Sequence, residues 1–426
     1  MKIRSFHEMK GFLTLWVGQS LSSLGSGMTG YALVIWSYTQ GGSALMTALL
    51  MVSSYAPYVL LSVFAGALSD RWNKKITMLV CDLFAALTTV AVLILLHLNR
   101  LEIWHIYLIN AISGVMNTVQ QPASEVAVTR LLPKQHYQKV GGLRYFSNSL
   151  NTILTPVLTT AVLGFWGMEA VIAIDLCTFC FAFLSLLLFI RLPESSENTT
   201  GKERFSDSVK GGLYWLKTNR GVLMLILLLA AINLVASMYD AAFPAMILSR
   251  QGGSEQVMGI VNTVIGVSML AGSVLASFAK EPKSRVRVIC NCLLFSMGTE
   301  NLLLALGRNV WVWSIGGFLG WIAIPLMNAN LDAIMRTKTP DAMQGRVYSV
   351  RNSMQFFTIP IGYLLGGIAV DYVFEPLMAA QEGGVLTTIF GTGKGSGAAL
   401  FFLFLAVLGT AVCFVFRKSK TLWSLE

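Results

Sequence analysis

Charged residues are scarce in this sequence. Only 12% of the 426 residues are Asp, Glu, Lys or Arg, whereas 55% are hydrophobic, and the mean hydropathy is +0.65. Soluble domains carry about 25% charged residues, so this composition excludes a soluble protein of this length. The apolar residues lie in blocks of about 20, the length that a helix needs to cross a bilayer core. Because lipid offers the backbone no hydrogen bonds, the sequence predicts an all-α integral membrane protein embedded in the lipid bilayer.

The sequence also lacks the motifs of the common enzyme classes. It contains no HExxH or GxSxG pattern, and the run 391–396 lacks the glycine spacing and the residue order of a P-loop. We interpret that run as a flexible external loop. The six cysteines all fall in predicted membrane helices, and the one CxxC pair, Cys177 and Cys180, has no second pair at metal-ligand spacing. We therefore expect no enzyme activity, no cofactor and no metal, and an ion gradient as the energy source.

The positive charges follow a topological pattern. If the N-terminus is cytoplasmic, all but four of the 31 Lys and Arg residues lie on the cytoplasmic side; the exceptions are Arg100, Arg250, Arg308 and Lys394. This positive-inside pattern predicts two cytoplasmic termini and a multi-pass protein of the bacterial cytoplasmic membrane. It also accounts for the net charge of +10, so nucleic-acid binding is not expected. The predicted spans are 12–36, 45–68, 76–98, 103–123, 143–164, 169–190, 221–248, 256–279, 287–307, 310–331, 346–369 and 397–416.

One long hydrophilic segment, 191–220, divides the twelve spans into two sets of six. Within it Phe205, Val209, Leu213 and Leu216 recur at helical spacing, which predicts an amphipathic helix on the membrane surface. The predicted domains are an N-terminal six-helix bundle (1–190), a linker (191–220) and a C-terminal six-helix bundle (221–426).

The two halves resemble each other. Two short segments recur in the second half at offsets of 204 and 206 residues: 148–151 matches 352–355, and 65–66 matches 271–272. This repeat indicates an internal duplication. Transporters built in this way bind their substrate near the midplane between the halves. Small residues four apart let helices approach closely, and prolines within spans allow kinks. The residues concerned are Gly316 with Gly320, Gly362 with Gly366, and Pro57, Pro156, Pro244, Pro325 and Pro360.

The loop between the second and third predicted spans carries a motif. Residues 66–75 read Gly-Ala-Leu-Ser-Asp-Arg-Trp-Asn-Lys-Lys, which resembles the signature loop of the major facilitator superfamily. Asn73 stands where the family has Gly, and Asn tolerates a left-handed turn. The basic residues are expected to hold the loop at the anionic leaflet. The resemblance implies two pseudo-symmetric six-helix bundles and a gating motif of Gly66, Asp70, Arg71, Lys74, Lys75 and Arg346.

Within that superfamily the chain resembles drug:proton antiporters of the macrolide-efflux (Mef) type. The matching residues include Gly18-Gln19, Pro122-Ala123 and 374–376, together with a long outer loop at 371–396. The resemblance implies a monomer that exports amphiphilic, macrolide-like drugs in exchange for protons by alternating access, and so confers antibiotic resistance. Two alternatives stay open: an exporter of a siderophore or other metabolite, and, more remotely, a non-transporting membrane receptor or accessory subunit.

Carboxylates inside membrane spans are the candidates for proton coupling, because an ionisable group in lipid costs about 2.5–3.5 kcal/mol and needs a reason. Asp240 ranks first, on a predicted cavity-lining helix, and Glu300 and Asp175 follow. Asp82 lies six residues into its span and is attributed to the group around Asp70. Asp332 is expected to pair with Arg336 or Arg346 at the inner gate.

Aromatic and polar residues within spans are the candidates for lining a drug-sized cavity, since such cavities are mostly apolar with a few placed polar groups. The predicted cavity residues are Gln19, Tyr31, Trp36, Gln120, Asn148, Asn151, Asn233, Asn262, Asn328 and Gln355.

Overall fold

The computed structural model describes residues 3–131, 137–190, 205–340, 344–381 and 384–426, and within these ranges the chain is helical with no strand. Nine of the described helices are long and apolar enough to cross a membrane. The predicted all-α membrane fold is confirmed, and the number of twelve spans stays a prediction.

The chain forms two compact units, which we describe separately. Unit 1 comprises Met1–Gly41 and Leu49–Glu197, and unit 2 comprises Gly42–Ala48 and Asn198–Glu426. The predicted boundaries at 190 and 220 stay predictions. The helices of unit 1 are α1 (Ile3–Gly41), α2 (Ala44–Arg71, whose first residues belong to unit 2), α3 (Lys74–His97), α4 (Ile103–Leu131) and α5 (Tyr137–Phe189).

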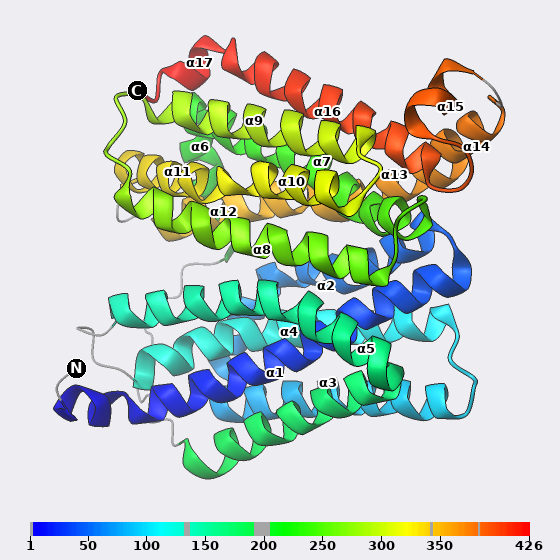
Figure 1. The fold of residues 1–426 in the computed structure, drawn as a ribbon. Helices are drawn as coiled ribbons and strands as arrows, with labels where there is room; N and C mark the ends of the chain where they lie inside the picture. The colour runs from blue at the N-terminus through cyan, green and yellow to red at the C-terminus, as the bar shows by residue number, and fades with distance from the viewer. Residues whose placement is uncertain (1–2, 132–136, 191–204, 341–343, 382–383) are drawn as a thin grey trace. The chain divides into compact units, whose positions relative to one another are not determined.

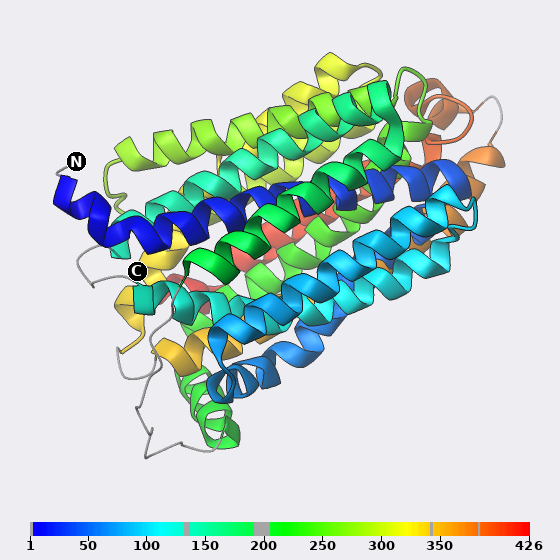
Figure 2. The same cartoon turned by 90° about the horizontal axis from the view of Figure 1, so that it is seen from below.

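Unit 1 is organised around α1 and α5. These two helices lie side by side (Figures 1 and 2), and α3 packs against both α4 and α5. Gly167 has φ 79° and ψ −174° and divides α5 into two helical halves. This turn falls between the predicted spans 143–164 and 169–190, and it brings the second half of α5 back along α1.

Unit 2 holds the remaining helices, with α7 and α9 packed against α16 and α10 packed against α8 and α9 (Figure 1). Its elements are α6 (Phe205–Thr218), α7 (Arg220–Ser249), α8 (Glu255–Phe278), α9 (Arg285–Leu306), α10 (Val310–Ile322), α11 (Ile324–Lys338), α12 (Gln344–Phe356), α13 (Thr358–Ala369), η3 (Val370–Phe374), α14 (Glu375–Ala379), α15 (Val385–Phe390), α16 (Ser396–Arg417) and α17 (Lys420–Trp423).

Asp371 explains why the start of α2 belongs to unit 2. Its carboxylate accepts hydrogen bonds from the backbone amides of Ala44 (3.0 Å) and Leu45 (2.9 Å) and from the hydroxyl of Ser43. The first amides of a helix have no partner within the helix, and a carboxylate there also interacts favourably with the helix dipole. Asp371 therefore caps α2 from η3.

Two predicted spans are interrupted near prolines. The span at 310–331 breaks into α10 and α11 at Ala323, and the span at 346–369 breaks into α12 and α13 at Phe357. Pro325 and Pro360 follow these breaks within three residues, as expected because proline cannot donate to the preceding turn. Pro57, Pro156 and Pro244 lie inside continuous helices.

The predicted long outer loop at 371–396 is wrong in part, because η3, α14 and α15 occupy much of it. The predicted amphipathic helix in the linker is present as α6, and residues 191–204 lie outside the described residues.

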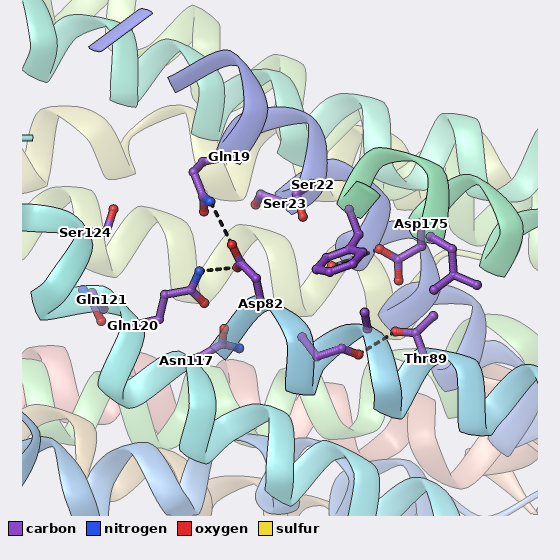
Figure 3. Close-up of a pocket in the computed structure, with 15 residues that line it drawn as sticks. Gln19, Ser22, Ser23, Asp82, Thr89, Asn117, Gln120, Gln121, Ser124 and Asp175 are labelled. Atoms are coloured by element: carbon purple, nitrogen blue, oxygen red, sulfur yellow. Dashed lines mark hydrogen bonds between the residues drawn. The ribbon is translucent and has the colours of Figure 1, made fainter. Parts of the chain in front are cut away.

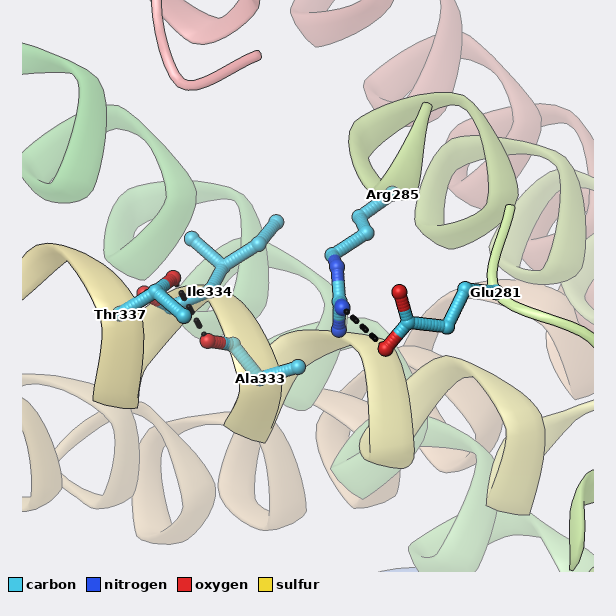
Figure 4. A network of polar contacts seen from close by, with 5 residues as sticks. All are labelled: Glu281, Arg285, Ala333, Ile334 and Thr337. Carbon is cyan, nitrogen blue, oxygen red and sulfur yellow. Dashed lines mark hydrogen bonds and ion pairs between the residues drawn. The ribbon is translucent and has the colours of Figure 1, made fainter. Parts of the chain in front are cut away.

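Ion pairs contribute little to the described structure. Arg285 pairs there with the exposed Glu281 at 3.4 Å (Figure 4). Such exposed pairs add little stability. Figure 4 also draws Thr337, whose hydroxyl donates to the carbonyls of Ala333 and Ile334 in its own helix. The expected pairing of Asp332 with Arg336 is absent among the described residues, and Asp332 is exposed. The side chain of Arg346 lies outside the described residues.

Candidate functional site

Unit 1 contains a partly open polar cavity of about 380 Å³. Three helices supply most of its lining, and each does so with residues at positions i, i+3, i+4 and i+7 (Figure 3). Residues at this spacing share one helix face. The lining residues are Gln19, Ser22, Ser23 and Ser26 on α1; Asp82, Ala85, Ala86 and Thr89 on α3; Asn117, Gln120, Gln121 and Ser124 on α4; and Asp175, Leu176 and Phe179 on the second half of α5.

Asp82 lies between two amides. Its Oδ1 accepts a hydrogen bond from Nε2 of Gln120, and its Oδ2 accepts one from Nε2 of Gln19 at 3.4 Å (Figure 3). The side chain is 7% exposed. Hydrogen bonds to an ionised group are stronger than neutral ones, so α1 and α4 both orient this carboxylate. The sequence position of Asp82 predicts a place in the group around Asp70, whereas the structure places Asp82 in the cavity.

Asp175 lies on the same cavity and is 3% exposed. Ser26 of α1 donates a hydrogen bond of 3.0 Å from Oγ to Oδ1 of Asp175. Gly25 makes this approach possible, because a Cβ atom there would lie 2.9 Å from Cα of Asp175 and 2.2 Å from Oγ1 of Thr178. The close packing of α1 on α5 thus positions the second carboxylate.

The charge of the cavity is one-sided. Among the described residues that line it, two are carboxylic acids and none is a cation. A second cavity of about 230 Å³ shares Gln19, Ser23 and Ser124 with it and adds Asn148 and Asn151. Asn151 donates to Oγ of Ser23 at 3.2 Å. Two carboxylates in a polar environment without counter-charges can accept protons or a cationic ligand.

Unit 2 contains the other two candidate acids, and they lie near each other. Glu300 is 3% exposed, accepts a hydrogen bond of 2.9 Å from Nε1 of Trp321, and is close enough to Asp240 and Tyr239 to interact electrostatically. The hydroxyl of Tyr239 is buried without a hydrogen bond of acceptable geometry. Asp240 is partly exposed.

The predicted cavity residues divide into two groups. Gln19, Gln120, Asn148 and Asn151 line the cavities of unit 1, and the others do not. Trp36 packs on the hydrophobic core of unit 1, and Tyr31 lies partly buried on the same helix. In unit 2, Asn233 donates to the carbonyl of Gln355 (3.3 Å), Asn262 donates to its own helix, and Asn328 is exposed.

Part of the predicted gating motif can be placed. The side chains of Asp70, Arg71 and Arg346 and the surroundings of Gly66 lie outside what the structure describes. Lys74 is 4% exposed. The ammonium of Lys75 donates to the carbonyls of Leu187 (2.9 Å) and Ile190 (2.7 Å) at the end of α5. That the basic residues hold the loop at the anionic leaflet stays a prediction.

The expected left-handed turn at Asn73 is wrong. Asn73 has φ −63° and ψ 118°, and its side-chain oxygen accepts hydrogen bonds from the amides of Lys75 (3.0 Å) and Ile76 (3.3 Å). Asn is among the preferred residues at the N-cap, and here it begins α3.

Several cavity residues were missed, although the sequence carries a signal for them. Ser22, Ser23, Ser26, Asn117 and Ser124 repeat the helical period of Gln19 and Gln120 inside otherwise apolar spans. Small hydroxyls are common in membrane helices, so single serines carry little information. The same i, i+3, i+4, i+7 spacing of polar residues on α1 and on α4 is the sequence signal that indicates the cavity.

Membrane-spanning helices around a polar, acid-lined cavity are typical of a membrane transporter. The sequence matches the Major Facilitator Superfamily over residues 15–363, and the chain belongs to this family.

Relatives and a solved structure support this assignment. The chain is similar to Macrolide efflux protein A of Streptococcus pyogenes, with 22% identity over 85% of this chain and 90% of the relative. It is also similar to the multidrug efflux pump Tap of Mycolicibacterium fortuitum, with 21% identity over 82% of this chain and 86% of the relative. The POT family transporter PepTSo shares the fold, with a TM-score of 0.71 at 12% identity over 98% of both chains.

Proposed function

We propose that this transporter exports amphiphilic, cationic small molecules such as macrolide-like drugs in exchange for protons, by alternating access. One observation carries the proposal: Asp82 and Asp175 line a single cavity of about 380 Å³ whose other described lining residues are uncharged. That volume is within the range of about 300–1,000 Å³ found for small-molecule sites. The names of two relatives, an efflux protein and an efflux pump, support export.

The charge of the cavity selects among cargoes. A protonated amine on a hydrophobic drug gains a counter-charge from Asp82 or Asp175, and Phe179 and Leu176 offer it apolar contacts. An anionic metabolite such as a siderophore would instead meet two carboxylates and no cation, and like charges repel. We therefore favour cationic cargo over the metabolite alternative.

The coupling step requires a group that exchanges a proton for the cargo. In this proposal Asp82 and Asp175 bind either a proton or the cation of the drug, but not both at once. Asp240 and Glu300 remain candidates for a second proton site, since they are adjacent in unit 2. The protein is proposed to act as a monomer, with both termini in the cytoplasm.

Everted vesicles with an imposed pH gradient and a pH-sensitive dye test the proposal. Macrolides, tetracyclines, cationic dyes and a siderophore are added in turn to vesicles with the native protein. We expect proton release with cationic amphiphiles, its loss in Asp82→Asn and Asp175→Asn, and its retention in Glu281→Gln, which removes an exposed acid. If no compound moves protons although the protein is folded, drug–proton exchange is wrong.

Binding measurements separate the two pairs of acids. A radiolabelled macrolide is expected to bind weakly to Asp82→Asn and Asp175→Asn, because the counter-charge is lost. Asp240→Asn and Glu300→Gln are expected to bind it normally and to lose only the coupled proton movement. Normal binding in all four variants would show that the cavity of unit 1 is not the drug site.

A further inference from the structure

Basic side chains converge on a small pocket in unit 2, at the end where α7 ends and α16 begins. The pocket has a volume of about 170 Å³ and is lined by Arg250, Arg308 and Lys394, together with Thr392 and Ser396. These three cations are three of the four that the positive-inside pattern leaves on the external side. They come from different parts of the chain, and the fold brings them together. We call this site the basic pocket.

Arg250 is the buried member of the basic pocket, with 6% of its surface exposed. Its Nη1 donates to the carbonyls of Leu304 (3.1 Å) and Ala305 (2.9 Å), and its Nη2 donates to the carbonyl of Phe390 (3.2 Å). These carbonyls fix the guanidinium but carry no negative charge. A buried cation without a counter-charge is costly.

The second arginine increases this cost. Arg308 donates to the carbonyls of Thr388 and of Ile389 (3.0 Å), so it too is held by neutral acceptors. Burial, and then the charge of Arg308, lower the pKa of Arg250 to about 10. Among the described residues that line the pocket none is acidic. The site therefore holds like charges together, which an anion would relieve.

The loop before α16 completes the pocket. Gly391, Gly393 and Gly395 have φ of 89°, 85° and 91°, in the left-handed region. The loop also packs directly on Arg250, because a Cβ atom at Gly395 would lie 2.9 Å from its backbone nitrogen. Glu375, the acid behind the loop, accepts hydrogen bonds of 3.0 Å from the amides of Gly395 and Ala398 and does not line the pocket.

We propose that the basic pocket binds a phosphate group, either as inorganic phosphate or as the headgroup of an anionic phospholipid. Arginine forks match the geometry of phosphate oxygens, and the hydroxyls of Thr392 and Ser396 can donate to the same group. The volume is several times the share of one water in the liquid, about 30 Å³, so a phosphate group fits. On the predicted topology the pocket faces the external leaflet.

The test uses the purified, delipidated full-length protein with two probes. Binding of ³²P-labelled inorganic phosphate is measured in one arm, and retention of phosphatidylglycerol against phosphatidylcholine is measured by native mass spectrometry in the other. The test variant is the double variant Arg308→Gln with Lys394→Gln, which leaves the buried Arg250 in place. Arg100→Gln removes the fourth predicted external cation, which is exposed in unit 1, and is the matched control.

We expect the double variant to bind its anion at least about tenfold more weakly, because charged donors are lost, and Arg100→Gln to bind as the native protein does. A loss confined to phosphatidylglycerol identifies a lipid headgroup, and a loss confined to inorganic phosphate identifies a free anion. The proposal is overturned if the native protein binds neither probe, or if the double variant binds both unchanged.

Discussion

Gln120 and Asp82, on the neighbouring helices α4 and α3, are joined by a hydrogen bond from the amide Nε2 to the carboxylate Oδ1. Gln19 of α1 donates to the other oxygen of the same carboxylate at 3.4 Å. Asp82 is thus oriented by two helices other than its own. A shift of α1 against α4 would change the environment of this acid, which couples helix movement to the charge of the cavity.

The first prediction concerns this amide. Gln120→Leu keeps most of the side-chain volume but removes a donor worth about 1.5–3 kcal/mol to a charged acceptor. We expect the affinity for a cationic substrate to fall about tenfold, because the carboxylate loses its orientation. Equilibrium binding of a radiolabelled cationic substrate measures this fall in affinity. Gln121→Leu is the control, since Gln121 lines the same cavity without bonding to Asp82; equal losses in both variants would refute the orienting role.

The second prediction concerns Asn73 as the N-cap of α3. Asn73→Ala should lower the free energy of unfolding by about 1 kcal/mol, whereas Asn73→Asp should be neutral and Asn73→Gly should cost a few tenths. These values follow because the side-chain oxygen of Asn73 accepts hydrogen bonds from the amides of Lys75 and Ile76, and Asn73 itself has φ −63°. Thermal unfolding in detergent measures the order. A stabilising Asn73→Gly would instead indicate a left-handed turn.

The sequence predicted the membrane fold well, because the signal is strong. Spans of about 20 apolar residues leave the backbone only one way to satisfy its hydrogen bonds. The turn at Gly167 lies between two predicted spans, and the breaks before Pro325 and Pro360 lie beside prolines that predict kinks.

The candidate site was harder to predict, because a carboxylate's role depends on its neighbours in space. The position of Asp82 near a span end predicts a place in the group around Asp70, yet Gln19 and Gln120 donate to it from two distant segments. Asn73 shows the same limit at short range. Asn serves both left-handed turns and helix caps, and only the backbone angles distinguish the two uses.

The third prediction concerns Lys75, whose ammonium caps the end of α5. Lys75→Met should destabilise the last turn of α5 by about 1 kcal/mol, since a cation there interacts with free carbonyls and with the helix dipole. Amide hydrogen exchange over residues 185–190 should then be about fivefold faster. Lys283→Met, at an exposed position in unit 2, is the control. Unchanged exchange in Lys75→Met would mean that the contacts with Leu187 and Ile190 carry no stability.

The last prediction concerns Gly320, which makes room for Glu300. A Cβ atom at Gly320 would lie 2.4 Å from Oε2 and 2.6 Å from Cβ of Glu300, so Gly320→Ala must displace this acid and its bond to Trp321. We expect a loss of about 1–3 kcal/mol in the free energy of unfolding, as for other overpacked sites. Thermal unfolding measures it.

Two further variants isolate the cause of that loss. Gly164→Ala, in α5, meets no atom within 4 Å and should be neutral or stabilising, because alanine favours helix over glycine. Glu300→Gly removes both the carboxylate and the Cβ atom that Gly320→Ala strikes. The double variant should therefore be more stable than the sum of the single losses predicts, since residues in contact are not additive. Strict additivity would show that Gly320 acts on the helix backbone alone and does not shape the position of Glu300.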